Sequence, residues 1–430
     1  MFKVNSSMKL KIIYLLLVIL SFSQVLTLKY INILVCVIIS IIMLLSSCEE
    51  CTTMLFLLLP FFNFFNYKMG TTSLYYIFTV IFIWKYIKYY EFKVPMKKIV
   101  ILLFLAVIRI FCFNAEIYFK WLCLFTVLVL TYNEDFFIEN IKETIENFSI
   151  SFIISSAVGL YMLQTGSSLY TYTKSYVNGS TRFAGLIGDN VFFAQIALVL
   201  AAFNFIILYK RFSLKNLLIV ISLYIFASLT ISKTAIILEV ILLILFLILL
   251  ILKYGAYKYT FIKSIIIMIL IGIGIFFSAY YIRNNTDNLV IQNYSTRFAS
   301  NDLSTGRDEI TNHYINKILQ TPQVWFCSMT YEDYSQPFYP NAHFTYTINR
   351  SHNIYIETIC CFGIIPSCFI FIWLIKRIIL LLTKNKILVL PIITIFLTGF
   401  TLHGHYEFHY YLILSLGFSV FNKKFYKKLN

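Results

Sequence analysis

The sequence predicts an all-α integral membrane protein with about 12–14 transmembrane helices, and three observations lead to this fold class. Sixty per cent of the 430 residues are hydrophobic and only 13% are charged, which is more apolar surface than a soluble core can bury. The apolar residues form runs of roughly 16 to 23 residues, a length that crosses a bilayer as a helix. These runs are continuously apolar and do not alternate with polar residues, which favours helices over strands.

Fourteen such runs are bounded by charged or polar clusters. Eleven precede a long polar stretch and three follow it, the last two being short for a bilayer about 30 Å thick. The runs lie at 12–28, 30–47, 51–66, 71–87, 99–114, 117–131, 149–165, 187–209, 214–231, 235–252, 264–281, 353–375, 387–402 and 408–421. The first run lacks a cleavage signal, so we expect it to be a retained helix.

The basic residues predict the orientation of these helices. With the N- and C-termini in the cytoplasm, 23 of the 35 Lys and Arg residues fall on the cytoplasmic side, eleven fall outside, and Arg109 falls within a span. This bias is the one that the positive-inside rule describes. The net charge of +16 therefore reflects topology, and we expect no nucleic-acid partner. The expected location is the cytoplasmic membrane, as a multi-pass protein.

The connecting segments define one polytopic domain, residues 1–430, with two notable outer loops. Residues 166–186 form a short extracytoplasmic loop, and residues 282–351 form a large one of about 70 residues. Within the large loop, "STGRDEITNHYINKILQTP" predicts a short helix, with Thr305 and Asp308 as a capping box and Pro322 as the stop. Residues 132–148 predict an amphipathic segment on the cytoplasmic surface. "CEEC", starting at Cys48, has the spacing of a redox or metal pair, but no second pair accompanies it.

Four basic residues predicted to face outward form the first candidate site. Arg182, Lys233, Arg307 and Arg350 come from three separate outer connections. Several cations directed at one place indicate a multiply charged anion, and at the outer leaflet the expected one is a lipid pyrophosphate. The alternative is that each side chain separately reaches a lipid phosphate at the membrane surface.

His352 stands at the start of an apolar run, in "NRSHNIYIETICCFGII". Ser351 or Asn353 is available as the helix cap. Because imidazole titrates near neutral pH, His352 is the candidate general base. Glu357 lies about 7.5 Å deeper at 1.5 Å rise per residue and is able to reach the same cavity. The alternative for His352 is a cap or an interface residue.

A histidine cluster and a buried pair complete the candidates. "HGHYEFHYY" places His403, His405, Glu407 and His409 at alternate positions, as a metal site or, as we prefer, a polar loop lining the outer pocket. We expect no metal and no other cofactor. Separately, Arg109 and Glu239 lie at matching depths of about 7 to 9 Å, which predicts an ion pair within the membrane.

These residues resemble those of the bacterial O-antigen and capsular polysaccharide polymerases, the Wzy group, and of the related O-antigen ligases. "TGRDEI" from Thr305 resembles the family's Gly-Arg before a loop helix, and "SHNIYIETICCFGII" resembles its His-Asn-x-Tyr followed by an acid and a glycine. "SKTA", which contains Lys233, stands where the family usually has Ser-Arg. The whole plan is also similar, with a large outer loop before the final spans.

The resemblance implies a GT-C-like, metal-independent, inverting glycosyltransferase that uses an undecaprenyl-pyrophosphate-linked oligosaccharide. By this resemblance, Arg182, Lys233 and Arg307 hold the donor pyrophosphate, His352 deprotonates the acceptor, and Asn353 orients the imidazole or the acceptor. Arg307 is thereby also a catalytic candidate, and Arg350 an additional phosphate ligand. Glu357 and His405 belong to the acceptor side or support it. Lysine at position 233 keeps the charge but loses the forked geometry of arginine.

Three functions remain open from the sequence. A polymerase joins repeat units for capsule, O-antigen or exopolysaccharide, whereas a ligase of the same family transfers glycan to another acceptor. A lipid-linked oligosaccharide flippase also has about fourteen spans, but its charges should line a central cavity, and its outer loops should be short. The expected partners are membrane lipids and, for a polymerase, flippase and chain-length regulator proteins.

Overall fold

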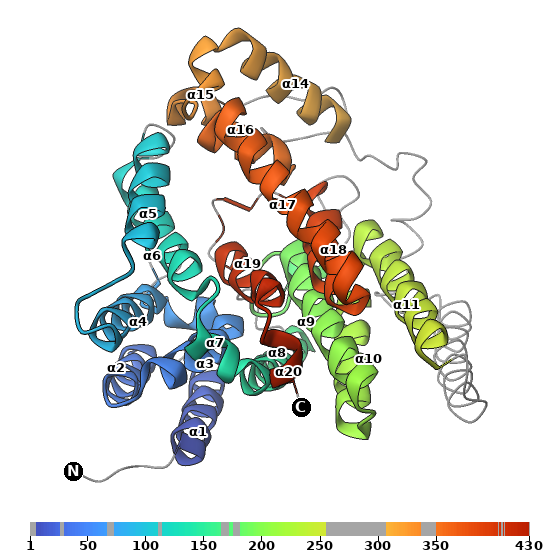
Figure 1. The fold of residues 1–430 in the computed structure, drawn as a ribbon. Coiled ribbons are helices and arrows are strands. Elements are labelled where there is room, and N and C mark those ends of the chain that lie inside the picture. Colours follow the sequence, from blue (N-terminus) through green and yellow to red (C-terminus); the bar gives the residue numbers. More distant parts are fainter. Residues whose placement is uncertain are drawn as a thin grey trace.

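The described part of the protein is built almost entirely from helices, which Figure 1 shows in chain order. The computed structural model describes residues 6–25, 30–66, 73–110, 114–164, 172–174, 181–254, 307–336, 350–402, 404–405, 407 and 409–429.

Before the large loop, the elements are α1 (Ser6–Val25), α2 (Ile31–Leu44), α3 (Cys48–Leu58), η1 (Leu59–Phe65), α4 (Tyr75–Tyr89), α5 (Met96–Ile108), α6 (Ala115–Thr131), α7 (Asp135–Glu139), α8 (Ile141–Gln164), β1 (Tyr172–Lys174), β2 (Thr181–Phe183), α9 (Asn190–Lys210), α10 (Leu214–Ser228) and α11 (Lys233–Tyr254). Strands β1 and β2 pair antiparallel between α8 and α9. From the large loop onward, the elements are α14 (Arg307–Gln320), η3 (Pro322–Trp325), α15 (Tyr331–Ser335), α16 (Ile354–Phe362), α17 (Ile364–Lys384), η4 (Lys386–Leu388), α18 (Val389–Gly399), α19 (Tyr410–Phe418), η5 (Ser419–Phe421) and α20 (Phe425–Lys428).

The protein is an all-α integral membrane protein, as the sequence predicts. Within the described residues, five helical segments are long and apolar enough to cross a membrane, namely Cys48–Phe65, Ile141–Met162, Asn190–Lys210, Lys233–Lys253 and Ile364–Lys384. Shorter apolar helices are Ile31–Leu44, Leu214–Ser228, Lys386–Gly399 and Tyr410–Phe421. The predicted run at 264–281 lies outside the described residues, and the count of 12–14 spans stays a prediction.

Helix α9 lies at the centre of the bundle, between α8, α10, α18 and α19 (Figure 1). Its most apolar stretch is 94% buried, whereas that of α17 is only 17% buried. Exposed side chains such as Leu103 and Phe104 on α5, and Phe369 and Ile375 on α17, are large and apolar. Because lipid tails solvate such side chains without cost, these peripheral faces fit a lipid environment.

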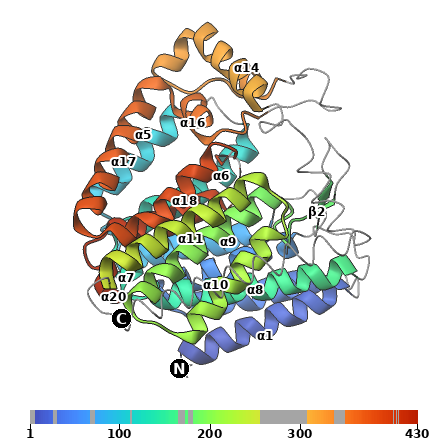
Figure 2. The same cartoon turned by 90° about the vertical axis from the view of Figure 1, so that its right-hand side faces the viewer.

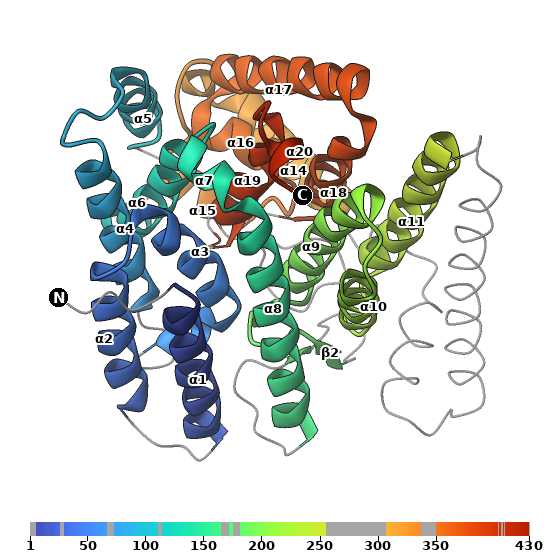
Figure 3. The same cartoon turned by 60° about the horizontal axis from the view of Figure 1, so that its bottom comes forward.

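Many of the basic residues predicted to be cytoplasmic gather at one end of the bundle, here called the basic end. Acidic partners from other helices neutralise some of them: Lys9 pairs with Glu50, Lys215 with Glu146, Lys424 with Asp135, and Lys428 with Glu139. These ion pairs place the starts of α1, α3, α8 and α10 at the same end of the bundle as α7 and α20. This arrangement is expected when successive membrane helices alternate in direction. In Figure 3, α1, α2 and α8 run side by side.

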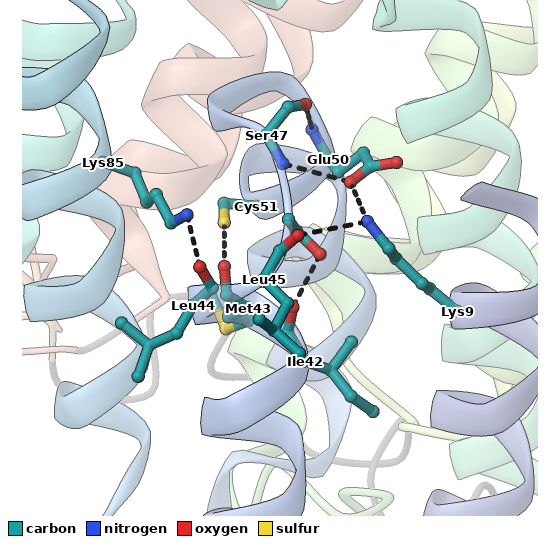
Figure 4. A network of polar contacts seen from close by, with 10 residues as sticks. Lys9, Ile42, Met43, Leu44, Leu45, Ser47, Glu50, Cys51 and Lys85 are labelled. Atoms are coloured by element: carbon teal, nitrogen blue, oxygen red, sulfur yellow. Dashed lines mark hydrogen bonds and ion pairs between the residues drawn. The ribbon is translucent and has the colours of Figure 1, made fainter. Parts of the chain in front are cut away.

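The turn between α2 and α3 shows how the basic end is built (Figure 4). Ser47 Oγ accepts the N–H of Glu50 at 3.3 Å, and the Glu50 carboxylate accepts the N–H of Ser47 at 3.1 Å and the ammonium of Lys9 at 2.7 Å. This reciprocal cap satisfies the N–H groups at the start of α3. The Cys51 thiol donates to the carbonyl of Met43 at 3.1 Å, so the second cysteine of "CEEC" closes a turn.

The predicted span 353–375 is wrong as a single helix, because the chain breaks at Gly363 into α16 and α17. Gly363 has φ 89°, and a Cβ at this position would lie 2.9 Å from the backbone N and O of Cys327. The large loop therefore packs against the break, and the Met329 N–H donates to the Cys360 carbonyl at 2.7 Å. Only glycine fits this combination of positive φ and close backbone approach.

Helices α14, α15 and α16 lie together at the end of the molecule away from the two termini (Figures 1 and 2). Helix α14 covers the segment where the sequence predicts the loop helix, and it ends just before Pro322. Its apolar face, Ile310, Tyr314 and Ile318, packs with Tyr334 of α15 and Ile356 of α16. This small core, separate from that of the bundle, fixes α16 and the residues before it.

Candidate functional site

The backbone at His352 has a positive φ, which is uncommon for a residue other than glycine. His352 has φ 48° and is half-buried, directly before α16. On its C-terminal side, Asn353 Oδ1 accepts the N–H groups of Tyr355 and Ile356 at 3.0 and 3.3 Å and so caps α16. On its N-terminal side, Ser351 Oγ donates to the Asn353 carbonyl at 3.1 Å. The neighbours thus hold His352 in a left-handed conformation, the kind of strain that clusters at functional sites.

Glu357 joins α16 to two other segments. Its carboxylate is fully buried and accepts the N–H of Gly404 at 2.5 Å and that of His405 at 2.9 Å. The hydroxyl of Tyr334 on α15 donates to the other carboxylate oxygen at 3.2 Å. The same hydroxyl accepts the N–H of Ser351 at 3.4 Å. Glu357 therefore fixes the 404–405 segment and the large loop beside His352.

Arg350 forms an ion pair across the same region. Its guanidinium donates to the Glu407 carboxylate at 2.5 Å, and both side chains are partly exposed. A phosphate bound by Arg350 must therefore share the guanidinium with Glu407 or displace this carboxylate. The sequence did not predict this pairing, because it assigned Glu407 to the histidine cluster.

His405 and Arg109 form a buried layer behind Glu357. The ring of His405 contacts Thr358 Oγ1 through Nε2 at 2.8 Å and the Tyr411 hydroxyl through Nδ1 at 2.6 Å. Arg109 is fully buried at the end of α5 and donates to the Tyr411 hydroxyl at 2.5 Å and to the His405 carbonyl at 3.3 Å. Its guanidinium also stacks over Trp121, 4.4 Å from the ring centroid. This layer connects α5, α6, α16 and α19 behind the start of α16.

The predicted ion pair between Arg109 and Glu239 is wrong. Glu239, on α11, accepts two hydrogen bonds from Ser228 Oγ at 2.9 and 3.1 Å. Helices α5 and α11 lie on opposite sides of the bundle (Figure 1). Equal depth in the membrane does not make two residues neighbours. The positions of their helices around the bundle decide which side chains come into contact.

The buried environment of His405 gives a pH prediction. Burial, with a smaller contribution from the Arg109 guanidinium, lowers the pKa of His405 well below its ordinary value of about 6.5. The unfolded chain therefore binds a proton at this residue that the folded chain does not bind, so the folded state loses stability as pH falls below about 6.5. We expect the thermal midpoint to decrease between pH 7 and pH 5, and His405→Gln to reduce this decrease. An unchanged pH dependence in the variant would contradict the assignment.

Two of the remaining three basic candidates, Arg182 and Lys233, are carried by a neighbouring group of elements. Arg182 lies in β2, opposite Thr173 of β1, and Lys233 is the first residue of α11. Their segments adjoin, because Phe183 packs against Phe226 with ring centroids 6.4 Å apart, and Asn190 donates to the Thr230 carbonyl at 3.4 Å.

Arg307 belongs instead to the His352 side, since it begins α14, which packs on α16.

Two contacts connect the elements around Arg182 and Lys233 with those around His352. The His409 ring meets Phe192 of α9 edge-on, with ring centroids 4.0 Å apart. Gln195 of α9 donates to Thr398 Oγ1 at 2.6 Å. Helix α9, which follows Arg182 in the chain, thus contacts His409, which follows His405. Joint binding of one ligand by all four cations stays a prediction.

The described members of the histidine cluster do not share a ligand site. His405 faces Thr358 and Tyr411, Glu407 faces Arg350, and His409 packs on Phe192. Among the residues that the structure describes, no group of three His, Cys, Asp or Glu side chains is arranged to hold a metal. His403 lies outside the described residues.

One stretch of the chain matches a known family. Residues 217–371 match the family model described as O-Antigen ligase, Wzy_C. The match confirms the resemblance to the Wzy and O-antigen ligase family, and supports a function of the O-antigen polymerase or ligase type. The matched residues include Lys233, Arg307, Arg350, His352 and Glu357, whereas Arg182 and His405 lie outside them. Searches among curated proteins and among solved structures found no match.

Proposed function

We propose that the protein is a polysaccharide polymerase that joins undecaprenyl-pyrophosphate-linked oligosaccharide repeat units at the outer face of the cytoplasmic membrane. The observation that carries this proposal is the left-handed conformation of His352, near Arg350 in the chain and directly before α16, the helix that packs against α14, which begins at Arg307. A titratable base near Arg350, with the other three cations proposed to bind the same ligand, suits the attack of a hydroxyl on a sugar whose leaving group is a pyrophosphate.

In the proposed reaction, the His352 imidazole takes the proton of an acceptor sugar hydroxyl. The hydroxyl oxygen then forms a bond with the anomeric carbon of the donor, while the bond from that carbon to the phosphate oxygen breaks. The electron pair leaves with undecaprenyl pyrophosphate, and its charge is balanced by Arg182, Lys233, Arg307 and Arg350. Because the attack is direct, the configuration at the anomeric carbon inverts.

Two supporting roles follow from the contacts. Asn353 uses its side-chain oxygen to cap α16, so it orients His352 through the backbone. Glu357 and His405 support the acceptor side by fixing the 404–405 segment. When Arg350 binds the pyrophosphate, its guanidinium either is shared with the Glu407 carboxylate or displaces it.

The direct test uses the purified protein and its lipid-linked repeat unit, with no nucleotide and no metal added. A ladder of glycans that grow by one repeat unit supports a polymerase, and unchanged substrate in the presence of folded protein contradicts the proposal. The description of the matched family favours ligation as the second candidate. A single transfer to a different lipid acceptor, with no ladder, would assign that function.

We further expect chelation by EDTA to leave the rate of chain growth unchanged. Four cationic side chains supply the positive charge that a metal ion supplies in other sugar-transferring enzymes. The measurement compares initial rates with and without EDTA, and restores divalent metal as a control. Loss of activity that metal restores would contradict a metal-independent reaction.

A further inference from the structure

A cavity of about 740 Å³ lies at the basic end of the bundle, remote from His352. Its walls come from the end of α4, the turn between α6 and α7, the second half of α17, and the end of η5 with the turn before α20. Tyr89, Tyr90 and Tyr132 line it together with Arg377 and Lys423. This volume is within the range of small-molecule sites, about 300–1,000 Å³. None of the proposed catalytic residues lines this cavity.

The acidic groups of the cavity are already engaged. The Glu134 carboxylate accepts the hydroxyls of Tyr86 and Tyr90, and it also pairs with Lys98. The Asp135 carboxylate pairs with Lys424 at 2.5 Å. The two negative charges at the cavity are therefore matched by two positive charges from neighbouring helices.

The other two cations of the cavity are not neutralised in this way. Within the described part of the chain, no carboxylate pairs with Arg377 or Lys423. The Tyr132 hydroxyl lies beside the Arg377 guanidinium, which also reaches over the ring of Trp373 at 5.9 Å. Tyr132 and Trp373 thus hold the Arg377 guanidinium at the cavity wall. The cavity thus carries two excess positive charges beside tyrosine hydroxyls.

We propose that this cavity binds a phosphate group, supplied by the head group of an anionic phospholipid. Arginine donates to phosphate oxygens in a forked geometry and lysine contributes a point charge. Tyrosine side chains favour the boundary between lipid and water, where such head groups lie. The excess of positive charge selects anionic lipids over zwitterionic ones, whose own ammonium cancels the attraction. This inference is independent of the proposed reaction.

The test compares thermal unfolding in nanodiscs of phosphatidylcholine alone with unfolding in nanodiscs that also contain phosphatidylglycerol. A ligand that binds the folded state raises its midpoint, so we expect phosphatidylglycerol to raise that of the natural protein by about 2 °C or more. The double variant Arg377→Gln/Lys423→Gln is expected to lose most of this rise. Native mass spectrometry should show one tightly held phosphatidylglycerol fewer on the same variant.

The matched control is Lys384→Gln/Lys427→Gln, which removes two exposed cations of α17 and α20 that do not line the cavity. This variant should keep the full rise. Equal loss in the two double variants would overturn the proposal, because it would show a general effect of surface charge. A separate arm adds inorganic phosphate to the protein in neutral detergent. Stabilisation there at millimolar concentration, together with no response to phosphatidylglycerol, would assign the cavity to a free anion and exclude the lipid head group.

Discussion

Replacing His352 with asparagine is expected to abolish chain growth while leaving the amount of folded protein unchanged. Removal of a general base lowers a rate by about 10²- to 10⁴-fold, which leaves no visible glycan ladder. Asparagine is the sharper substitution because it tolerates the left-handed conformation observed at this position, so the backbone before α16 stays in place. His352→Ala should lose activity equally, although with some added backbone strain. The measurement is the rate of ladder formation from the purified lipid-linked repeat unit.

The matched control for this experiment is His313→Ala, because His313 lies on α14, which packs against α16. It should retain most of the activity. Thermal midpoints separate loss of chemistry from loss of fold, since His352→Asn should unfold at nearly the temperature of the natural protein. Chain growth that persists in His352→Asn would remove this residue as the base and leave its conformation a structural feature.

Replacing Glu357 with alanine is expected to destabilise the protein and to abolish activity together. The substitution leaves the buried N–H groups of Gly404 and His405 without their acceptor. Each unsatisfied buried donor costs about 1–3 kcal/mol. Loss of the Glu357 carboxylate also frees the segment that carries His405 and Glu407. Because Glu407 pairs with Arg350, the position of Arg350 is also affected. Thermal unfolding in detergent and the rate of chain growth measure the two effects.

Glu357→Gln separates the two contributions of this residue. The glutamine amide retains one oxygen acceptor. Its NH₂ group, which cannot accept a hydrogen bond, then faces either the backbone N–H groups of Gly404 and His405 or the Tyr334 hydroxyl. We therefore expect a loss of stability smaller than that of Glu357→Ala. Glu116→Gln is the control, because that carboxylate is 65% exposed and pairs with Lys120 one turn away. Its effect should stay within about 0.5 kcal/mol. If Glu357→Ala unfolds at the same temperature as Glu116→Gln, the hydrogen bonds at Glu357 are not holding the segment.

The sequence singled out His352 as a candidate because the signal is local. A polar Arg-Ser-His-Asn group directly before an apolar run stands out against its surroundings, and Asn353 caps the helix as its residue type predicts. The loop helix was also predicted from a local pattern, because apolar residues recur every four positions at Ile310, Tyr314 and Ile318, and Pro322 ends the pattern. All of these features depend on residues within a few positions of one another.

The sequence was not sufficient to place Arg109 or to divide the run at Gly363. Hydrogen-bond partners of Arg109 lie 252, 296 and 302 positions further along the sequence. A local sequence pattern does not predict contacts between residues so far apart in the chain. Depth in the membrane was the available argument, and it led to Glu239 on a helix across the bundle. At Gly363 the apolar run continues without interruption, and the break follows from the backbone of Cys327, which packs where a Cβ would otherwise lie.

The sequence by itself determined that the protein crosses a membrane as helices and which family it resembles, and it supplied the candidates for holding a pyrophosphate and for accepting a proton. These properties depend on composition, on the length of apolar runs and on short motifs, all of which are local. The tertiary structure decided which of those residues share a surface: it joins Arg350 to Glu407, anchors the 404–405 segment on Glu357 and holds His352 in its left-handed conformation. Such pairings depend on how helices distant in the sequence are packed, and packing is set by the whole chain at once.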